Sequence, residues 1–308
     1  MKRILVIKPS SLGDIIHGLL VAESIRAQCP GVEIHWVARE IFAPLVEACE
    51  TVSKVHLFHR GAGLGAFGQL IQDVREIEYD YVLDMQGLAR SGVIAGFSKT
   101  PRNRRIGRAD DREGASISCG KRAILPDDFP EAHAVDILRG FLSVLELENE
   151  LRGQLTFTPP ERGMPDLPAD YVLIFPGSRR AEKEWWGFSD LTKRILNERP
   201  EIPVVWTGDV EAPTPMGCES IRNLTGQTPL NVLPQMIAHA RLVVCNDSGP
   251  MHLAAALKRP VVGIFGPTSP RRFGPYPLVA PQNRVVEAPE GKLMQLDVQS
   301  VWQELDLQ

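Results

Sequence analysis

The stretch KPSSLGD at residues 8–14 places a carboxylate where a helix is expected to begin. The apolar run of residues 4–7 stops at Pro9 and an amphipathic run follows Asp14, an order that predicts strand, loop and helix. A helix N-terminus stabilises an anion through its amides and dipole, so Asp14 occupies the place that a phosphate takes in many nucleotide-binding loops. Asp14 either caps the helix or acts as a general base toward a bound hydroxyl.

A second loop, FPGSRRAEKEWW at residues 175–186, follows an apolar run and suits a diphosphate. It offers a glycine, the hydroxyl of Ser178 and the cations Arg179, Arg180 and Lys183 ahead of the next helix. The alternative interpretation is a solvated, charged loop.

A third loop, CNDSGPMHLAAA at residues 245–256, gathers several polar and small residues after another apolar run. Ser248 and Gly249 let backbone amides approach a ligand closely at the start of a helix, and Pro250 fits the first helical turn. His252 lies one turn further on, and a lone helical histidine is often structural. The loop predicts a second part of an anion-binding site.

Two further loops give weaker signals. The acid of Thr207-Gly208-Asp209 could meet a ribose or merely cap a turn, and GIFGPTSP at residues 263–270 could be only a turn.

Residues 99–122 carry eight cations against three acids, which indicates either a solvated surface or a dock for an acidic, phosphorylated partner.

The elements that position these loops alternate between strand-like and helix-like runs, which predicts an α/β protein with parallel sheets wound by helices. Ligands collect beyond the carboxyl ends of parallel strands, where these loops fall. Four prolines within residues 157–171 suit an extended linker, so we expect domains at residues 1–157 and 158–292. A terminal segment, residues 293–308, has helical spacing and is expected to pack back on one domain, with the first as the candidate.

Bulk composition excludes several classes. The 308 residues exceed one typical domain, and 44% hydrophobic with 23% charged residues is typical of a soluble globular protein. Five cysteines stand far apart without a CxxC pair, which argues against zinc and disulfide scaffolds and fits a reducing cytoplasm. No apolar run approaches the ~20 residues of a membrane span, and no signal peptide is expected. The net charge of -4 says nothing about nucleic acid.

Four stretches together resemble a known family: KPSSLGDIIH, FPGSRRAEKEW, NLTGQTPL and NDSGPMHLAAALKRPVVGIFGPTSP. The chain is similar to the ADP-heptose heptosyltransferases of glycosyltransferase family 9, and KPSSLGD is closest to the heptosyltransferase I branch. This resemblance implies the GT-B architecture, in which two Rossmann-like, doubly wound domains face each other across a cleft. It further implies that the first domain binds the acceptor and the second the nucleotide-sugar donor.

The resemblance also implies an activity. A heptose would pass, with inversion, from ADP-L-glycero-D-manno-heptose to a hydroxyl of the lipopolysaccharide inner core on Kdo-lipid A, with Asp14 as the general base. No cofactor and no metal site are expected, since the chain has no DxD triplet and cations with helix ends can stabilise the leaving diphosphate. Expected partners are the donor and the lipopolysaccharide precursor, without nucleic acid.

The resemblance assigns the remaining site residues. The donor residues are Ser178, Arg179, Lys183, Asp209, Gln227, Thr228, Asp247, Ser248, Gly249 and His252. The expected acceptor residues are Ser10, Ser11 and Gly13 in the first loop, together with Arg60, Arg105, Arg108 and Arg112, which are chosen by their charge alone as candidates for Kdo carboxylates and lipid A phosphates. The acid that binds the ribose is either Asp209 or Glu211, and Arg179 stands where close relatives often carry a hydroxyl.

The expected location is the cytoplasm, peripheral at the inner face of the cytoplasmic membrane and held there by electrostatics. Other activities stay open at this point: a heptosyltransferase that acts on a protein or another glycan, a sugar-nucleotide epimerase, or a non-catalytic protein that binds sugar nucleotides.

Overall fold

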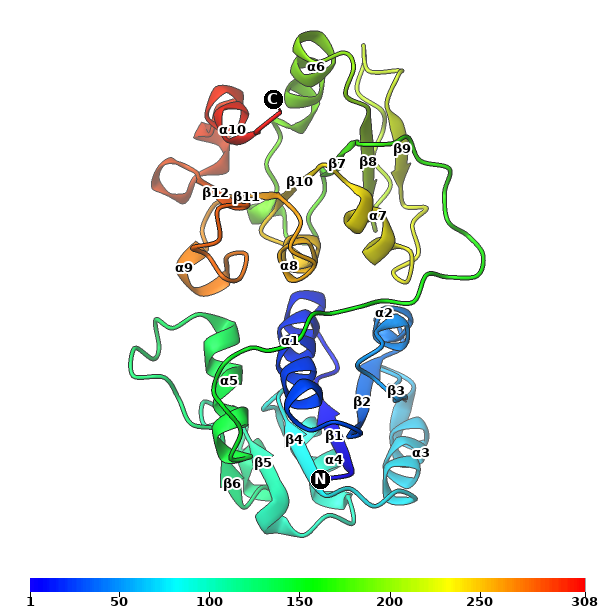
Figure 1. Cartoon of the computed structure of the whole chain (residues 1–308), viewed down its shortest axis with the longest axis vertical. Coiled ribbons are helices and arrows are strands. Elements are labelled where there is room, and N and C mark those ends of the chain that lie inside the picture. Colours follow the sequence, from blue (N-terminus) through cyan, green and yellow to red (C-terminus); the bar gives the residue numbers. More distant parts are fainter. Residues whose placement is uncertain (308) are drawn as a thin grey trace. The chain divides into compact units, whose positions relative to one another are not determined.

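A computed structural model describes residues 1–307, apart from the side chain of Ser116. The chain divides into two compact units, Met1–Thr158 and Pro159–Gln308, drawn from blue to green and from green to red in Figure 1. Each unit has its own parallel sheet with helices packed on it.

The first unit contains a six-stranded sheet in the order β3-β2-β1-β4-β5-β6, and every neighbouring pair is parallel. Its strands are β1 (Arg3–Ile7), β2 (Glu33–Arg39), β3 (Lys54–Phe58), β4 (Tyr81–Asp84), β5 (Arg105–Gly107) and β6 (Lys121–Arg122). Its helices are α1 (Leu12–Gln28), α2 (Ala43–Ala48), α3 (Gly63–Arg75), α4 (Ala89–Phe97) and α5 (Ala134–Val144), with short 3-10 turns η1 (Arg102–Arg104) and η2 (Ala115–Ser118).

Strand β1 lies in the middle of this sheet because both of its faces are apolar. Ile4, Leu5, Val6 and Ile7 are fully buried, as expected for a strand covered on both sides by helices. Four residues separate the end of β1 from the start of α1. The loop between them therefore opens at the carboxyl edge of the sheet, next to the end of β4, where the strand order reverses.

The second unit repeats this plan with the order β12-β11-β10-β7-β8-β9. Its strands are β7 (Val172–Phe175), β8 (Val204–Gly208), β9 (Arg222–Thr225), β10 (Leu242–Asn246), β11 (Val261–Phe265) and β12 (Asn283–Glu287). Its helices are α6 (Phe188–Glu198), α7 (Leu233–His239), α8 (Gly249–Ala256), α9 (Pro270–Phe273) and α10 (Val298–Glu304), with 3-10 turns η3 (Ala181–Lys183), η4 (Pro289–Gly291) and η5 (Leu293–Gln295). Counted from its first strand, each sheet has the same order.

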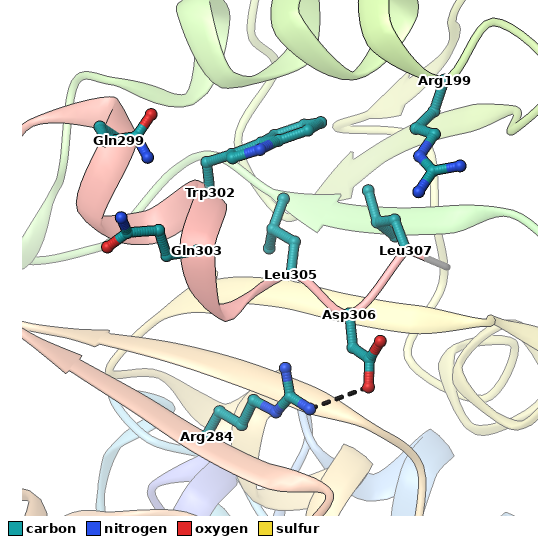
Figure 2. Close-up of a pocket in the computed structure, with 8 residues that line it drawn as sticks. All are labelled: Arg199, Arg284, Gln299, Trp302, Gln303, Leu305, Asp306 and Leu307. Carbon is teal, nitrogen blue, oxygen red and sulfur yellow. Dashed lines mark hydrogen bonds and ion pairs between the residues drawn. The ribbon is translucent and has the colours of Figure 1, made fainter.

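The terminal segment packs on the second unit, so its expected return to the first domain is wrong. Val301, Leu305 and Leu307 are buried in the same apolar core as Trp185 and Ile195, because the apolar side of α10 covers β12 and α6. A cavity of about 500 Å³ lies beside this segment, and Arg284 on β12 pairs with Asp306 at 3.0 Å. Figure 2 draws the residues that line it. None of the predicted site residues lines it.

In the part of the chain from Met1 to Leu307, no helix combines the length and the apolar character that a membrane crossing requires.

The hydroxyl of Tyr79 lies between two buried histidines, His35 on β2 and His56 on β3. The hydroxyl of Tyr79 lies 3.1 Å from Nδ1 of His35 and 2.9 Å from Nε2 of His56, so it can donate to one ring and accept from the other. Burial, followed by nearby cations, lowers the pKa of each imidazole to about 4. Both rings are therefore neutral in the folded protein near pH 7.

This cluster predicts a loss of stability in weak acid. Unfolded histidines have a pKa of about 6.5, so between pH ~6.5 and ~4 the unfolded chain binds more protons than the folded one. The contribution of each neutral imidazole to the free energy of unfolding is fully present above pH ~6.5 and is lost toward pH ~4, by up to about 3 kcal/mol. Urea denaturation across this range measures it, with His56→Gln flattening the loss and the exposed His59→Gln as control. If the free energy of unfolding falls equally with pH in His56→Gln and His59→Gln, the buried imidazole of His56 is not the cause of the loss.

Candidate active site

Both carboxylate oxygens of Asp14 have partners in the loop after β1. Its Oδ2 accepts hydrogen bonds from the backbone N–H of Ser11 at 3.0 Å and from the Ser11 hydroxyl at 2.7 Å, while Lys8 Nζ lies 3.2 Å from Oδ1. Ser11 is the N-cap of α1, and Asp14, the third residue of the helix, helps to cap it by bonding back to the Ser11 N–H, in line with one interpretation of the sequence. The side chain nevertheless keeps 45% of its surface exposed, which leaves the carboxylate open to a ligand.

Lys8, the cation paired with Asp14, was not singled out by the sequence analysis. It follows β1 directly and its side chain is only 2% exposed, since the sheet and helices of the first unit surround it. Burial lowers the pKa of Lys8, and the carboxylate of Asp14 opposes that shift. Trp36 fixes the backbone here by donating from Nε1 to the Lys8 carbonyl at 3.1 Å. The sequence offered one indication of this burial, a lysine directly after the apolar run of residues 4–7.

The electrostatics of this pair keep Asp14 ionised. Desolvation by the surrounding protein raises the pKa of Asp14, but the Lys8 ammonium and the two hydrogen bonds from Ser11 outweigh it, so the pKa lies well below its usual range. A carboxylate of this kind stays ionised across the physiological pH range, so its proton-accepting form is always present, although its basicity is low. It suits a reaction in which the proton leaves the hydroxyl late, after that oxygen has formed most of its new bond.

Lys8→Met is expected to move the acid limb of the activity profile to higher pH. Removing the ammonium leaves the desolvation of Asp14 unopposed by its main cation, so the pKa of Asp14 rises and the base becomes protonated at a higher pH. The measurement is kcat/KM against pH for the wild type, Lys8→Met and the exposed control Lys54→Met. Superimposable acid limbs for wild type and Lys8→Met would exclude this role.

Two arginines predicted to bind the acceptor have partners within the protein. The guanidinium of Arg105 donates to the carbonyls of Thr100 at 2.7 Å, Ser98 at 3.2 Å and Ser118 at 3.4 Å. These bonds hold neighbouring loops together and use three of the five guanidinium N–H groups, while the assignment of Arg105 to the acceptor stays a prediction. Arg108 is paired with Asp110 at 2.6 Å and is less available than its charge suggested.

The other predicted acceptor residues lie at the surface or in the loop after β1. Arg60 and Arg112 are exposed, while Ser10 is half-buried and Gly13 is buried beside Asp14. The first unit therefore brings Ser11 and Gly13 to Asp14.

In the second unit, three loops meet at Asp247. Lys183 Nζ lies 2.5 Å from Asp247 Oδ2, and the hydroxyl of Thr268 donates to the same oxygen at 2.6 Å. These residues follow β7, β10 and β11, so the carboxyl edge of the sheet assembles them as the topology predicts. Both members of the ion pair are largely buried. Thr268 was noted in the sequence only as part of a turn and was missing from the predicted site.

Asn246 holds the loop that carries Lys183. Its Oδ1 accepts from the N–H of Trp185 at 3.0 Å, and its Nδ2 lies 3.4 Å from the carbonyl oxygen of Pro176 and 3.5 Å from that of Gly177. The fully buried side chain therefore contacts both ends of the loop of residues 176–185. Sequence reasoning missed this role, because an amide next to an acid gives no sign of which loop it contacts.

Helix α8 presents its N-terminus at the same edge. Ser248 is the N-cap residue and α8 runs from Gly249 to Ala256, so the N-terminal end of the helix begins next to Asp247. His252 is buried in that turn. The positive end of the helix dipole and the ammonium of Lys183 together favour an anion here.

The remaining predicted donor residues lie around β8 and β9. Arg179 and Asp209 form an exposed ion pair at 2.5 Å, which links the loops after β7 and β8. The hydroxyl of Thr207 donates to that of Thr228 at 2.8 Å, and Gln227 is exposed beside it. Ser178 is half-buried and accepts from the N–H of Arg180 at 3.3 Å.

Side chains that could hold a metal do not gather in the described residues: no group of three or more His, Cys, Asp or Glu forms there.

Comparisons with known proteins agree on one family. The profile of Glycosyltransferase family 9 (heptosyltransferase) matches residues 67–304. The chain is 28% identical over 302 residues to Lipopolysaccharide heptosyltransferase 1 of Pseudomonas aeruginosa, covering 89% of this chain and 81% of that protein. It is 26% identical over 329 residues to Lipopolysaccharide heptosyltransferase 1 of Escherichia coli K12, covering 98% and 99%.

Solved structures give the same result for the fold. The structure of E. coli ADP-heptose lps heptosyltransferase II has a TM-score of 0.76 and 26% identity, with 99% of this chain and 98% of that chain covered. E. coli heptosyltransferase WaaC with ADP has a TM-score of 0.80 at 22% identity, with 98% of each chain covered. The predicted class, two Rossmann-like α/β domains of the GT-B type, is confirmed.

Proposed function

The chain belongs to glycosyltransferase family 9 (heptosyltransferase), and from this membership we propose that it transfers a heptose from ADP-L-glycero-D-manno-heptose to a hydroxyl of Kdo-lipid A in the lipopolysaccharide inner core. The relatives' names support the acceptor class, since they are lipopolysaccharide heptosyltransferases of types 1 and 2. The observation that carries the chemistry is Asp14, ionised and half-exposed at the carboxyl edge of the first sheet.

We propose that the reaction inverts the anomeric carbon. Asp14 accepts the proton of the acceptor hydroxyl as that oxygen attacks the carbon from the face opposite the diphosphate. The carbon–oxygen bond to the diphosphate breaks, and ADP leaves with the bonding electrons. Lys8 keeps Asp14 ionised between turnovers, and Ser11 holds the carboxylate in one orientation.

On the donor side, Lys183 and the amides at the start of α8 stabilise the charge that grows on the leaving ADP. Asp247 orients the ammonium of Lys183, and Thr268 orients Asp247. Cations and helix amides in this arrangement can supply the stabilisation that a divalent ion gives in other transferases. Either Asp209 or Glu211 would meet the ribose, and Asp209 would first have to release Arg179.

On the acceptor side, the exposed guanidiniums of Arg60 and Arg112 are the candidates for the Kdo carboxylates and lipid A phosphates. A lipid-anchored acceptor also implies a peripheral position at the inner face of the cytoplasmic membrane.

A donor and acceptor panel with mass spectrometry tests the proposal. We expect a product heavier by one heptose only with ADP-heptose and Kdo-lipid A, and tighter calorimetric binding of ADP than of UDP or GDP. Transfer to a protein or an outer-core glycan instead would change the acceptor assignment. Conversion of the sugar nucleotide without any acceptor would identify an epimerase, and binding without turnover a non-catalytic protein.

A further inference from the structure

Helix α4 exposes an apolar stripe to solvent. Arg90, Val93 and Phe97 recur at helical spacing on one side, while Ile94 and Ala95 on the other side are buried against the sheet. Val93 is 39% and Phe97 is 50% exposed. The outer face of this helix thus combines a cation with two large apolar side chains.

The turn η2 extends the stripe into a patch. It packs on α4 at Gly92, where an added Cβ would lie 2.5 Å from the carbonyl oxygen of Ala115. Ile117 in this turn is 75% exposed. Val93, Phe97 and Ile117 form what we call the α4 patch, three apolar side chains on adjoining elements of the first unit.

Four cations flank the α4 patch. Arg75 donates to the carbonyl of Phe97 at 3.3 Å and Arg102 to the carbonyl of Ile117 at 3.1 Å, so each guanidinium is bonded to the backbone of a patch residue. Arg90 lies on the same helix face, and Lys99 follows Phe97 by two residues. Acids also stand near these segments in the sequence: Asp73 and Glu76 beside Arg75, and Asp110, Asp111 and Glu113 before Ile117. Glu113 accepts a hydrogen bond from the N–H of Ala89.

We propose that the α4 patch docks the protein on an anionic phospholipid bilayer, an inference that rests on the proposed transfer to a lipid-anchored acceptor. Three apolar side chains are far fewer than the ~20–30 residues that each partner contributes to a stable protein interface. A bilayer interface needs only a few inserted apolar groups when cations beside them meet anionic headgroups. The patch has both features, on a helix too short to cross the membrane.

Co-sedimentation with vesicles tests this docking. Wild type is expected to bind phosphatidylglycerol/phosphatidylcholine vesicles, to bind pure phosphatidylcholine weakly, and to dissociate at high salt. Phe97→Ser with Ile117→Ser, and separately Arg90→Glu with Lys99→Glu, are each expected to weaken binding at least ~10-fold. The matched control is Val279→Ser with Met294→Ser, whose parent side chains are 92% and 85% exposed on the second unit.

Three outcomes overturn the docking surface: equal binding by the wild type and both patch variants, no vesicle binding by the wild type, or a patch-dependent dimer in solution that does not bind vesicles. The charge variant alters only exposed side chains, so it remains informative if the apolar variant misfolds. Transfer to a de-acylated, water-soluble acceptor separates the two proposals. That activity persists in the patch variants if the inference is right, and its absence in a vesicle-binding wild type would reject the proposed function instead.

Discussion

Asp14→Asn is expected to slow heptosyl transfer by ~10²–10⁴-fold, the usual contribution of a general base. The amide keeps the size of the carboxylate and can still accept from Ser11, but it cannot take the acceptor proton. Affinity for ADP should stay unchanged, because the donor residues belong to another unit of the chain. Steady-state turnover and calorimetry with ADP measure the two quantities.

The control is Asp73→Asn on α3, where the carboxylate accepts a hydrogen bond from the amide of Gln69 at 2.8 Å. Loss of capping at Asp14 should cost about 1 kcal/mol of stability, too little to explain the loss of rate. Turnover of Asp14→Asn within about tenfold of the wild type would reject Asp14 as the base.

Lys183→Met is expected to weaken ADP binding roughly 10–100-fold, as expected for loss of a charged hydrogen bond to the diphosphate. It should also lower the free energy of unfolding by about 3 kcal/mol, because the largely buried carboxylate of Asp247 loses its cation. Asp247→Asn keeps the ammonium but frees it from its carboxylate partner. Its effect on affinity should therefore be smaller than that of Lys183→Met.

Calorimetry with ADP and urea denaturation measure both effects. The exposed Lys193, paired with Asp190 on α6, provides the matched control Lys193→Met. Unchanged ADP affinity in Lys183→Met would remove Lys183 from the donor site, whatever happens to stability.

The strand and loop order could be predicted because each loop with chemistry follows an unbroken apolar run. Asp14 stood out by its position after such a run; in the structure it takes part in capping α1 and remains accessible, and its role as a base stays a prediction. Asp247 and Lys183 were assigned through separate motifs, but their direct pairing depends on two strands becoming neighbours in the sheet. Sequence spacing does not contain that information.

The errors and omissions have physical reasons too. Counting charges could not reveal that Arg105 donates hydrogen bonds to three backbone carbonyls. Lys8 was overlooked because its role depends on burial, and Asn246 because its partners lie about 60–70 positions away along the chain. The terminal helix was assigned to the wrong unit because an apolar face shows that a helix packs, without showing on which core.

The strand order of the first sheet recurs in the second, although no sequence repeat of 20–50 residues accompanies it. Each unit has its own core and its own reversal of strand order. Mutations in the loops of one unit are therefore expected to leave the packing of the other core intact. If the proposed division of acceptor and donor between the units holds, one half can diverge toward new acceptors while the other keeps its nucleotide, and hybrids that exchange whole halves between relatives become a route to altered specificity.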